Sequence, residues 1–375
     1  MLTAELNERD LAALRAHREY PAVSVILPTH RTFPDNKQDP VLLRSLLDEA
    51  STRLRDASLP RGIADEVTGS LEAAAAESDL EHAAEALVLF AAPGGEHHTF
   101  SLPYVHPRSR VAIGQSFATR DLVAAQEHVW SYWTLVLSEQ PARLWSGTGE
   151  RLTESRVGGF PLSRDARRLP LQRARGHGGC VCPRSQGGSG GDRPPEETQL
   201  RHMFGEMASV LATDGRPLVV TGVARHLAYF EQLAPAPVMS QFIGSAEGSF
   251  DHTPGPELAA IVAPVLTDER QRWQAEAIGR LETARSERLF AGGLTQVWDL
   301  AAAGQIRELL AEEGYLAPAR QDEGHLLPPG DPGGEQVDDA VDAIMDAVLD
   351  GGGEVIFVPD GSLESSHRVA ASLRY

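Results

Sequence analysis

The sequence is poor in cysteine and lysine and has no long hydrophobic run. Cysteine occurs only at Cys180 and Cys182 among the 375 residues, which excludes a disulfide framework and indicates a reducing compartment. No apolar run approaches the roughly 18 residues needed to span a bilayer. The first residues also lack the basic and apolar segments of a signal peptide. We therefore expect a cytoplasmic protein without membrane contact.

Positive charge is scarce as well. The chain has 34 lysine and arginine residues against 53 acidic ones, a formal net charge of -19, and Lys37 is its only lysine. Such an acidic surface repels nucleic acid in general, and we expect no DNA partner. One stretch is locally basic, because it contains several arginines and a single acidic residue, Asp165. These arginines are Arg164, Arg167, Arg168, Arg173, Arg175 and Arg184.

The arginine-rich stretch lies within residues 164–195, a segment that is rich in glycine and has no apolar periodicity. We predict that this segment is a long loop. Short apolar runs predict strands over 134–138, 142–146 and 217–222, and a helix over 196–212 directly follows the loop. Two interpretations stay open: the arginines contact phosphates, or they only keep a flexible loop soluble.

Alternating helices and strands on both sides of this region predict an α/β fold class. The elements expected before it are a helix over 4–17, a strand over 22–28, a helix starting at Pro40 with Asp39 as N-cap, a helix over 63–78, and a hairpin of strands 86–91 and 97–103. Those expected after it are a short strand over 238–243, helices over 255–289 and 295–303, a strand over 305–311, a loop over 318–336, a helix over 337–350, and strands over 354–359 and 369–375.

Five segments, taken in order and spacing, carry a resemblance to a known family. They are residues 23–28 with the Asp39-Pro40 helix start, 142–147, 218–222, 292–310 and 372–375. Together they resemble the bacterial branch of the archaeo-eukaryotic class I release factor superfamily, which also contains Pelota-type ribosome rescue factors and the hibernation factor Balon.

The resemblance implies three domains joined by a helix. They are an N-terminal α/β domain over 1–129, a central ribonuclease-H-like domain over 130–252 that carries the loop 164–195, a connecting helix over 253–289, and a C-terminal three-layer α/β domain over 290–375 that resembles kink-turn-binding ribosomal proteins.

The sequence departs from the family at both functional motifs. In the family, a Gly-Gly-Gln tripeptide in the long loop supports peptidyl-tRNA hydrolysis. The nearest strings here are Gly178-Gly179-Cys180 and Gln186-Gly187-Gly188, where Gln186 precedes its glycines. The codon-reading motif is replaced by Asp35-Asn36-Lys37-Gln38-Asp39-Pro40. We therefore expect no enzymatic hydrolysis and no stop-codon recognition.

The resemblance then implies a non-hydrolytic factor that binds the ribosomal A-site region in hibernation, rescue or translation control. The arginine-rich loop would contact rRNA. The expected partners are the ribosome or its rRNA, with an elongation factor as a further candidate, and no cofactor is implied. The alternative is an acidic cytoplasmic interaction module that has lost ribosome binding.

Three other patterns have competing interpretations. His177, Cys180 and Cys182 are weak candidates for a zinc site, because they lack a fourth ligand, and a degenerate hydrolase would use Cys180 or His177. A nuclease would need several acids on adjacent central strands, and only Glu139 is near them. On the 337–350 helix, an acidic row indicates a solvated face or a docking face for a basic ribosomal protein: Asp338, Asp339, Asp342, Asp346 and Asp350.

Overall fold

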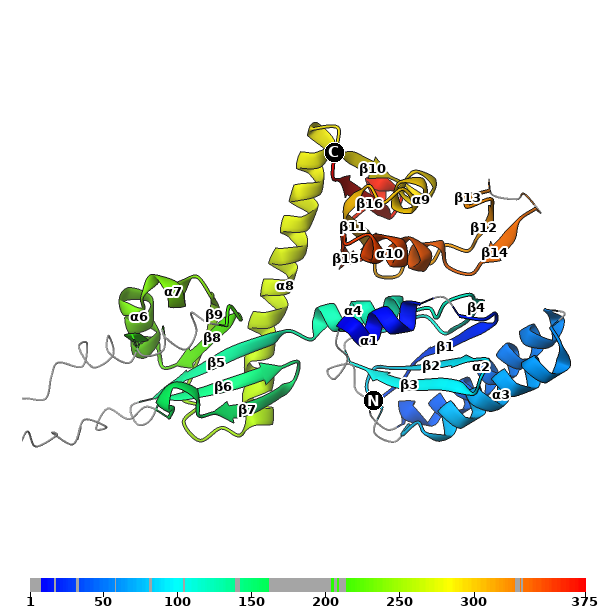
Figure 1. Cartoon of the computed structure of the whole chain (residues 1–375). Coiled ribbons are helices and arrows are strands. Elements are labelled where there is room, and N and C mark those ends of the chain that lie inside the picture. Colours follow the sequence, from blue (N-terminus) through cyan, green and yellow to red (C-terminus); the bar gives the residue numbers. More distant parts are fainter. Residues whose placement is uncertain are drawn as a thin grey trace, which may run out of the picture. The chain divides into compact units, whose positions relative to one another are not determined.

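A computed structural model describes most of the chain in two compact units (Figure 1). It describes residues 8–375 except 17, 32–33, 58, 81–82, 104, 139–141, 162–203, 206–207, 209–213, 328–330 and 332. Unit 1 comprises Met1–Val129 and Arg272–Tyr375, and unit 2 comprises Trp130–Gln271. Both contain helices packed on sheets, which confirms the α/β fold class. The four-part division by residue number stays a prediction.

The N-terminal lobe of unit 1, residues 8–129, is built on an antiparallel sheet of order β3-β2-β1-β4. Its elements are α1 (Glu8–Arg15), β1 (Ala22–Pro28), η2 (Asp35–Lys37), α2 (Asp39–Asp56), α3 (Arg61–Ala76), β2 (Ala86–Ala92), β3 (Glu96–Leu102), β4 (Arg110–Gly114) and α4 (Arg120–His128). Leucine, valine and alanine side chains of α2 and α3 bury one face of this sheet. The other face belongs to a core shared with the C-terminal lobe.

The C-terminal lobe, residues 272–375, has a sheet of order β10-β16-β11-β15, in which only β11 and β15 are parallel. Its elements are the last part of α8 (Gly255–Ser286), β10 (Phe290–Gly292), α9 (Leu294–Ala302), β11 (Ile306–Glu312), β12 (Ala319–Asp322), β13 (His325–Leu326), β14 (Glu335–Val337), α10 (Ala340–Asp350), β15 (Glu354–Val358), η4 (Glu364–Ser366) and β16 (Val369–Leu373). α8 packs on one face of the sheet, and α9 and α10 cover the other.

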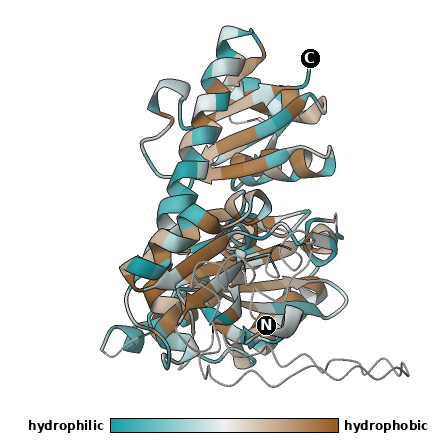
Figure 2. Cartoon of the chain, turned by 90° about the vertical axis from the view of Figure 1, so that its left-hand side faces the viewer, coloured by the Kyte–Doolittle hydropathy of each residue, from teal (hydrophilic) through white to brown (hydrophobic). Residues whose placement is uncertain are grey.

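Unit 2 has a mixed sheet of order β7-β6-β5-β8-β9, with β5, β8 and β9 parallel and β6 and β7 antiparallel to their neighbours. Its elements are β5 (Ser131–Leu137), β6 (Arg143–Thr148), β7 (Arg151–Ser155), η3 (Val157–Gly159), β8 (Leu218–Gly222), α6 (Ala224–Leu233), α7 (Ala236–Met239), β9 (Phe242–Glu247) and the first part of α8. One face packs against α6 and the other against α8. The apolar residues concentrate along the strands (Figure 2).

Gly147 leaves room for the ring of Tyr132 to lie flat on this sheet. A Cβ atom at Gly147 would lie 2.3 Å from the ring of Tyr132, its cross-strand partner. The Tyr132 ring is 1% exposed and covers the glycine. The sequence Gly147-Thr148-Gly149 therefore serves strand packing and the β6–β7 turn.

Several predicted elements need correction. Asp39 is the first residue of α2 and Gln38 is the N-cap, because the Asp39 carboxylate binds His30 instead of capping the helix. The expected strand 238–243 is split between α7 and β9. The expected loop 318–336 contains the three-stranded sheet β13-β12-β14. Among the described helices, none is long and apolar enough to cross a membrane.

Candidate functional site

The sequence-predicted RNA-binding and metal candidates lie within residues 162–203, outside the described residues. This applies to Arg164, Arg167, Arg168, Arg173, Arg175 and Arg184, to Gly178, Gly179, Gln186, Gly187 and Gly188, and to His177, Cys180 and Cys182. Two described residues close to the ends of this segment are buried in the core of unit 2. Phe160 and Phe204 are 3% and 0% exposed and belong to the same core on one face of the unit 2 sheet.

The central strands of unit 2 carry hydroxyl groups rather than acids. Thr134 on β5 and Thr221 on β8 are both fully buried. Within the described ranges, no three His, Cys, Asp or Glu side chains converge on a possible metal position. Glu139 lies outside those ranges. Two-metal phosphodiester cleavage needs converging carboxylates, and the described strands do not supply them.

The segment that replaces the codon-reading motif is held by a buried aspartate. Asp35–Lys37 form the short helix η2, and Asp39 is 1% exposed. The Asp39 carboxylate accepts a hydrogen bond from the His30 backbone N–H and contacts His30 Nδ1, both at 2.8 Å. This pair fixes the path of the chain between β1 and α2.

A buried and densely connected polar site lies between the two lobes of unit 1, at Arg120. Its side chain is 2% exposed and stacks over the Phe357 ring, 5.2 Å from the ring centroid. One terminal nitrogen donates to the carbonyl oxygens of Glu312 and Glu313 at 2.7 and 2.8 Å. The other donates to the Tyr315 carbonyl and to Asp339. A single guanidinium thus satisfies three backbone acceptors of the opposite lobe.

The acidic row begins just before α10, and most of it faces the N-terminal lobe, so the prediction of a solvated face is wrong except at Asp350, whose side chain is 70% exposed. Asp342 accepts the Arg120 backbone N–H at 2.8 Å, at the start of α4. Asp338 accepts from Arg53 at 2.6 Å and from the Ile113 backbone N–H at 2.8 Å. Arg15 lies 3.8 Å from Asp346 and 3.6 Å from Asp350. The alternative of a free docking face for a ribosomal protein fails for the same reason, because these contacts occupy it.

The buried acids at this interface have perturbed proton affinities. Burial raises the pKa of Asp342 to about 7, and the nearby charge of Asp339 adds to the effect. Burial and the charge of Asp342 also raise the pKa of Asp346 well above its ordinary value.

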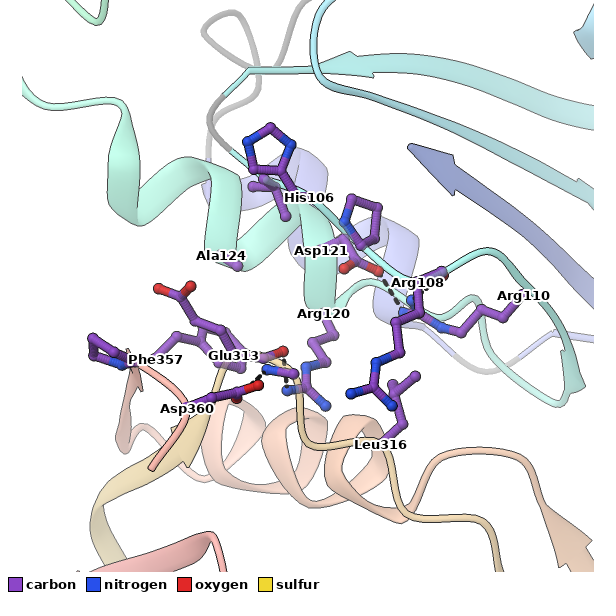
Figure 3. A pocket seen from close by; sticks show the side chains of 14 residues that line it. His106, Arg108, Arg110, Arg120, Asp121, Ala124, Glu313, Leu316, Phe357 and Asp360 are labelled. Atoms are coloured by element: carbon purple, nitrogen blue, oxygen red, sulfur yellow. Dashed lines mark hydrogen bonds and ion pairs between the residues drawn. The ribbon is translucent and has the colours of Figure 1, made fainter. Parts of the chain in front are cut away.

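A cavity of about 370 Å³ opens beside Arg120, with walls from both lobes (Figure 3). Two of its lining residues, Arg110 and Asp121 of α4, form an ion pair. The residues that line it are Val105, His106, Pro107, Arg108, Arg110, Arg120, Asp121, Ala124, Glu313, Gly314, Leu316, Phe357, Pro359 and Asp360. Arg108, Arg110 and Arg120 were not predicted, because isolated arginines carry no motif. The acidic row on α10 was the signal that matching cations exist elsewhere in the chain.

Comparison with known proteins gives one family match. Residues 131–305 match the sequence model described as bacterial archaeo-eukaryotic release factor family 3. The matched segment includes the arginine-rich stretch and most of unit 2. No curated protein matches the chain.

Solved structures give low-identity similarities. Pelota from Archaeoglobus fulgidus is 14% identical with a TM-score of 0.40, over 98% of this chain and 92% of that chain. A ribosome-bound archaeal Pelota, described together with ABCE1, is 13% identical with a TM-score of 0.41, over 98% and 94%. Saccharomyces cerevisiae Dom34 is 13% identical with a TM-score of 0.39, over 77% and 79%. At these values the similarities carry no argument about function.

Proposed function

We propose, from the match of residues 131–305 to the model of bacterial archaeo-eukaryotic release factor family 3, that the protein binds the ribosomal A-site region without hydrolysing peptidyl-tRNA. In this role it occupies ribosomes during hibernation, rescue or another form of translation control. The family match carries the proposal, because it spans the whole arginine-rich stretch.

The sequence of that stretch lacks the tripeptide that hydrolysis requires in this superfamily. A catalytic loop of this superfamily needs glutamine directly after two glycines. Here Cys180 follows Gly178-Gly179, and Gln186 precedes Gly187. A thiol at the position of the glutamine amide cannot supply the same polar contact to water. A peptide-release assay on ribosomes carrying peptidyl-tRNA is expected to give no release above the rate without protein.

The distribution of charge favours ribosome binding through the arginine-rich stretch. The protein has a net charge of -19, so its surface in general is repelled by RNA phosphates. The arginines from Arg164 to Arg184 concentrate positive charge in one short stretch. Arginine forms bidentate hydrogen bonds with phosphate, and each neutralised phosphate releases counterions. Ribosome binding through this stretch must therefore weaken steeply as salt is raised.

The net charge also supports a second candidate function. A net charge of -19 tells against RNA binding, and in this second function the protein is an acidic interaction module that has lost ribosome binding. The two candidates differ in one observable, because only the first requires association with purified ribosomes.

Co-sedimentation with 70S ribosomes tests the proposal. We expect the protein to pellet with ribosomes at low salt and to be released as salt is raised. Replacing Arg164, Arg167, Arg168, Arg173 and Arg175 with glutamine is expected to reduce the logarithmic salt slope by about 0.7 to 0.9 for each phosphate that the variant no longer neutralises.

A matched variant controls for net charge. Arg9, Arg44, Arg151, Arg156 and Arg307 are all exposed on described elements or turns, and their replacement with glutamine removes the same five charges. This control is expected to keep most of the wild-type binding. Equal weakening in both variants would contradict the assignment to the arginine-rich stretch, and no pelleting of the wild type at any salt would favour the interaction module.

A further inference from the structure

The cavity beside Arg120 has the size and composition of a small-molecule site. Its volume of about 370 Å³ falls within the roughly 300 to 1,000 Å³ typical of ligand pockets. Apolar side chains from both lobes form part of its walls, among them Pro107, Leu316 and Pro359. A cavity with apolar walls and a few converging polar groups is the usual form of a ligand site.

Most of the charged groups that line the cavity are separated by sign, and the exception is Asp121, which pairs with Arg110 on the basic side. Figure 3 shows Arg108 and Arg110 on one side, and Glu313 and Asp360 on the other. Arg120 lies between them and already donates to Asp339 and to backbone carbonyls. The cavity therefore presents donors at one end and carboxylates at the other.

Two hydrogen-bond donor groups on the arginine side of the cavity have no acceptor among the described residues. Arg110 pairs with Asp121 through a terminal nitrogen, but its Nε is buried and has no hydrogen-bond partner among the described residues. Arg108 is exposed, and its guanidinium makes no hydrogen bond or ion pair with a described residue. Buried N–H groups in folded proteins nearly always have a partner. A bound anion would pair with Arg108 and with the part of Arg110 that lines the cavity, whereas the buried Nε of Arg110 is not accessible to it.

The acidic side calls for hydrogen-bond donors on the same ligand. Asp360 accepts from the Gly314 backbone N–H at 2.8 Å and lies 3.2 Å from Arg368, which leaves carboxylate lone pairs for a further donor. A simple anion would be repelled by this side. A molecule with phosphate at one end and hydroxyl or amino groups at the other fits both ends.

We propose that this cavity binds a nucleoside monophosphate. Its phosphate contacts Arg108 and Arg110, and its ribose hydroxyls or base amino group donate to Asp360 and Glu313. This inference is independent of ribosome binding, because every residue involved lies in unit 1 and the test uses the isolated protein. Since both lobes contribute walls, the bound nucleotide also holds the lobes together and raises the thermal midpoint.

Isothermal titration calorimetry and thermal unfolding with AMP, GMP, CMP and UMP test the proposal. At least one is expected to bind and to raise the midpoint as its concentration increases. Adenosine and guanosine, which lack phosphate, are expected to bind at least about tenfold more weakly, because they cannot form the hydrogen bonds to the charged arginines. Inorganic phosphate is expected to bind more weakly than the nucleotide.

Variants of an exposed arginine keep the test free of folding defects. Arg108→Gln is expected to weaken nucleotide binding at least about tenfold, and Arg108→Lys is expected to restore part of it, because lysine keeps the charge but not the planar fork. The matched control Arg44→Gln changes an exposed arginine on α2, away from the cavity, and is expected to bind as the wild type does.

Three results would overturn the inference. They are the absence of binding by all four nucleotides at millimolar concentration, wild-type affinity in Arg108→Gln, and inorganic phosphate binding as tightly as the best nucleotide. The last result would show that Asp360 and Glu313 do not contribute to nucleotide binding.

Discussion

Two arginines, one in each unit, make the same kind of contact in different surroundings. Arg120 pairs with Asp339 and stacks on Phe357, and the two side chains of the ion pair are 2% and 5% exposed. Arg143 pairs with Glu154 and stacks on Trp145, but the paired side chains are 18% and 38% exposed. The difference in burial decides their energetic weight, because water screens the second pair and replaces its hydrogen bonds when it breaks.

The largest effect is expected for Arg120→Ala. The substitution removes the ion-pair partner of buried Asp339 and one donor from each of three carbonyl oxygens, at a cost of about 3 to 5 kcal/mol. The Glu312 carbonyl keeps the Tyr315 N–H, and Asp339 keeps two backbone N–H donors. Urea unfolding followed by tryptophan fluorescence and circular dichroism measures the decrease in stability. A decrease below about 1 kcal/mol would mean that water enters the lobe interface and replaces the guanidinium.

A pH-dependent effect of intermediate size is expected for Asp342→Asn. Because the pKa of Asp342 is raised from 3.8 to about 7, the folded protein holds a proton that the unfolded chain has released. Stability therefore falls as pH rises through the window from about 4 to about 7. Asparagine keeps an acceptor for the Arg120 N–H and carries no charge. The variant is expected to match the wild type near pH 4 and to exceed it by a few kcal/mol at about pH 8.

The measurement is the difference in unfolding free energy between variant and wild type across pH, so that other titrating groups cancel. The charged groups facing Asp342 are Arg110, Asp121, Asp339 and Asp346. A difference that does not change with pH would show that the Asp342 carboxylate is solvated.

The smallest effect is expected for Arg143→Ala, the matched substitution in unit 2. An exposed pair contributes about 0 to 1 kcal/mol, and stacking on Trp145 adds an amount of similar size. Most of the ionic part is expected to disappear at high salt. A destabilisation as large as that of Arg120→Ala would show that burial does not determine how much each ion pair contributes to stability.

The elements with strong local patterns were predictable. The strand β1 has the predicted bounds of 22–28, because a β-branched apolar run closed by proline leaves little choice. The hairpin of β2 and β3 and the start of α8 at Gly255 also agree with their patterns. The sheet β13-β12-β14 was missed, since short strands in a segment rich in proline and glycine give no period.

The candidate site was not predictable, because its contacts join distant parts of the chain. The row of aspartates on α10 has the spacing of a solvated helix face, and only tertiary structure reveals the cations opposite. Arg53 and Asp338 are 285 positions apart, and no local pattern relates them. The arginine-rich stretch poses the opposite case, since its composition is informative and its role stays a prediction.

The lobe interface also fixes an order of events during synthesis. Thr119 and Asp346 are 227 positions apart, so at about 5 to 20 residues per second the N-terminal lobe waits roughly 10 to 50 seconds for its partner helix. Meanwhile the apolar side chains of this lobe that belong to the shared core lack the C-terminal part of that core. Unit 2 is one continuous stretch and can close as soon as it has emerged. The nascent N-terminal lobe is therefore the part of this protein most in need of chaperone protection.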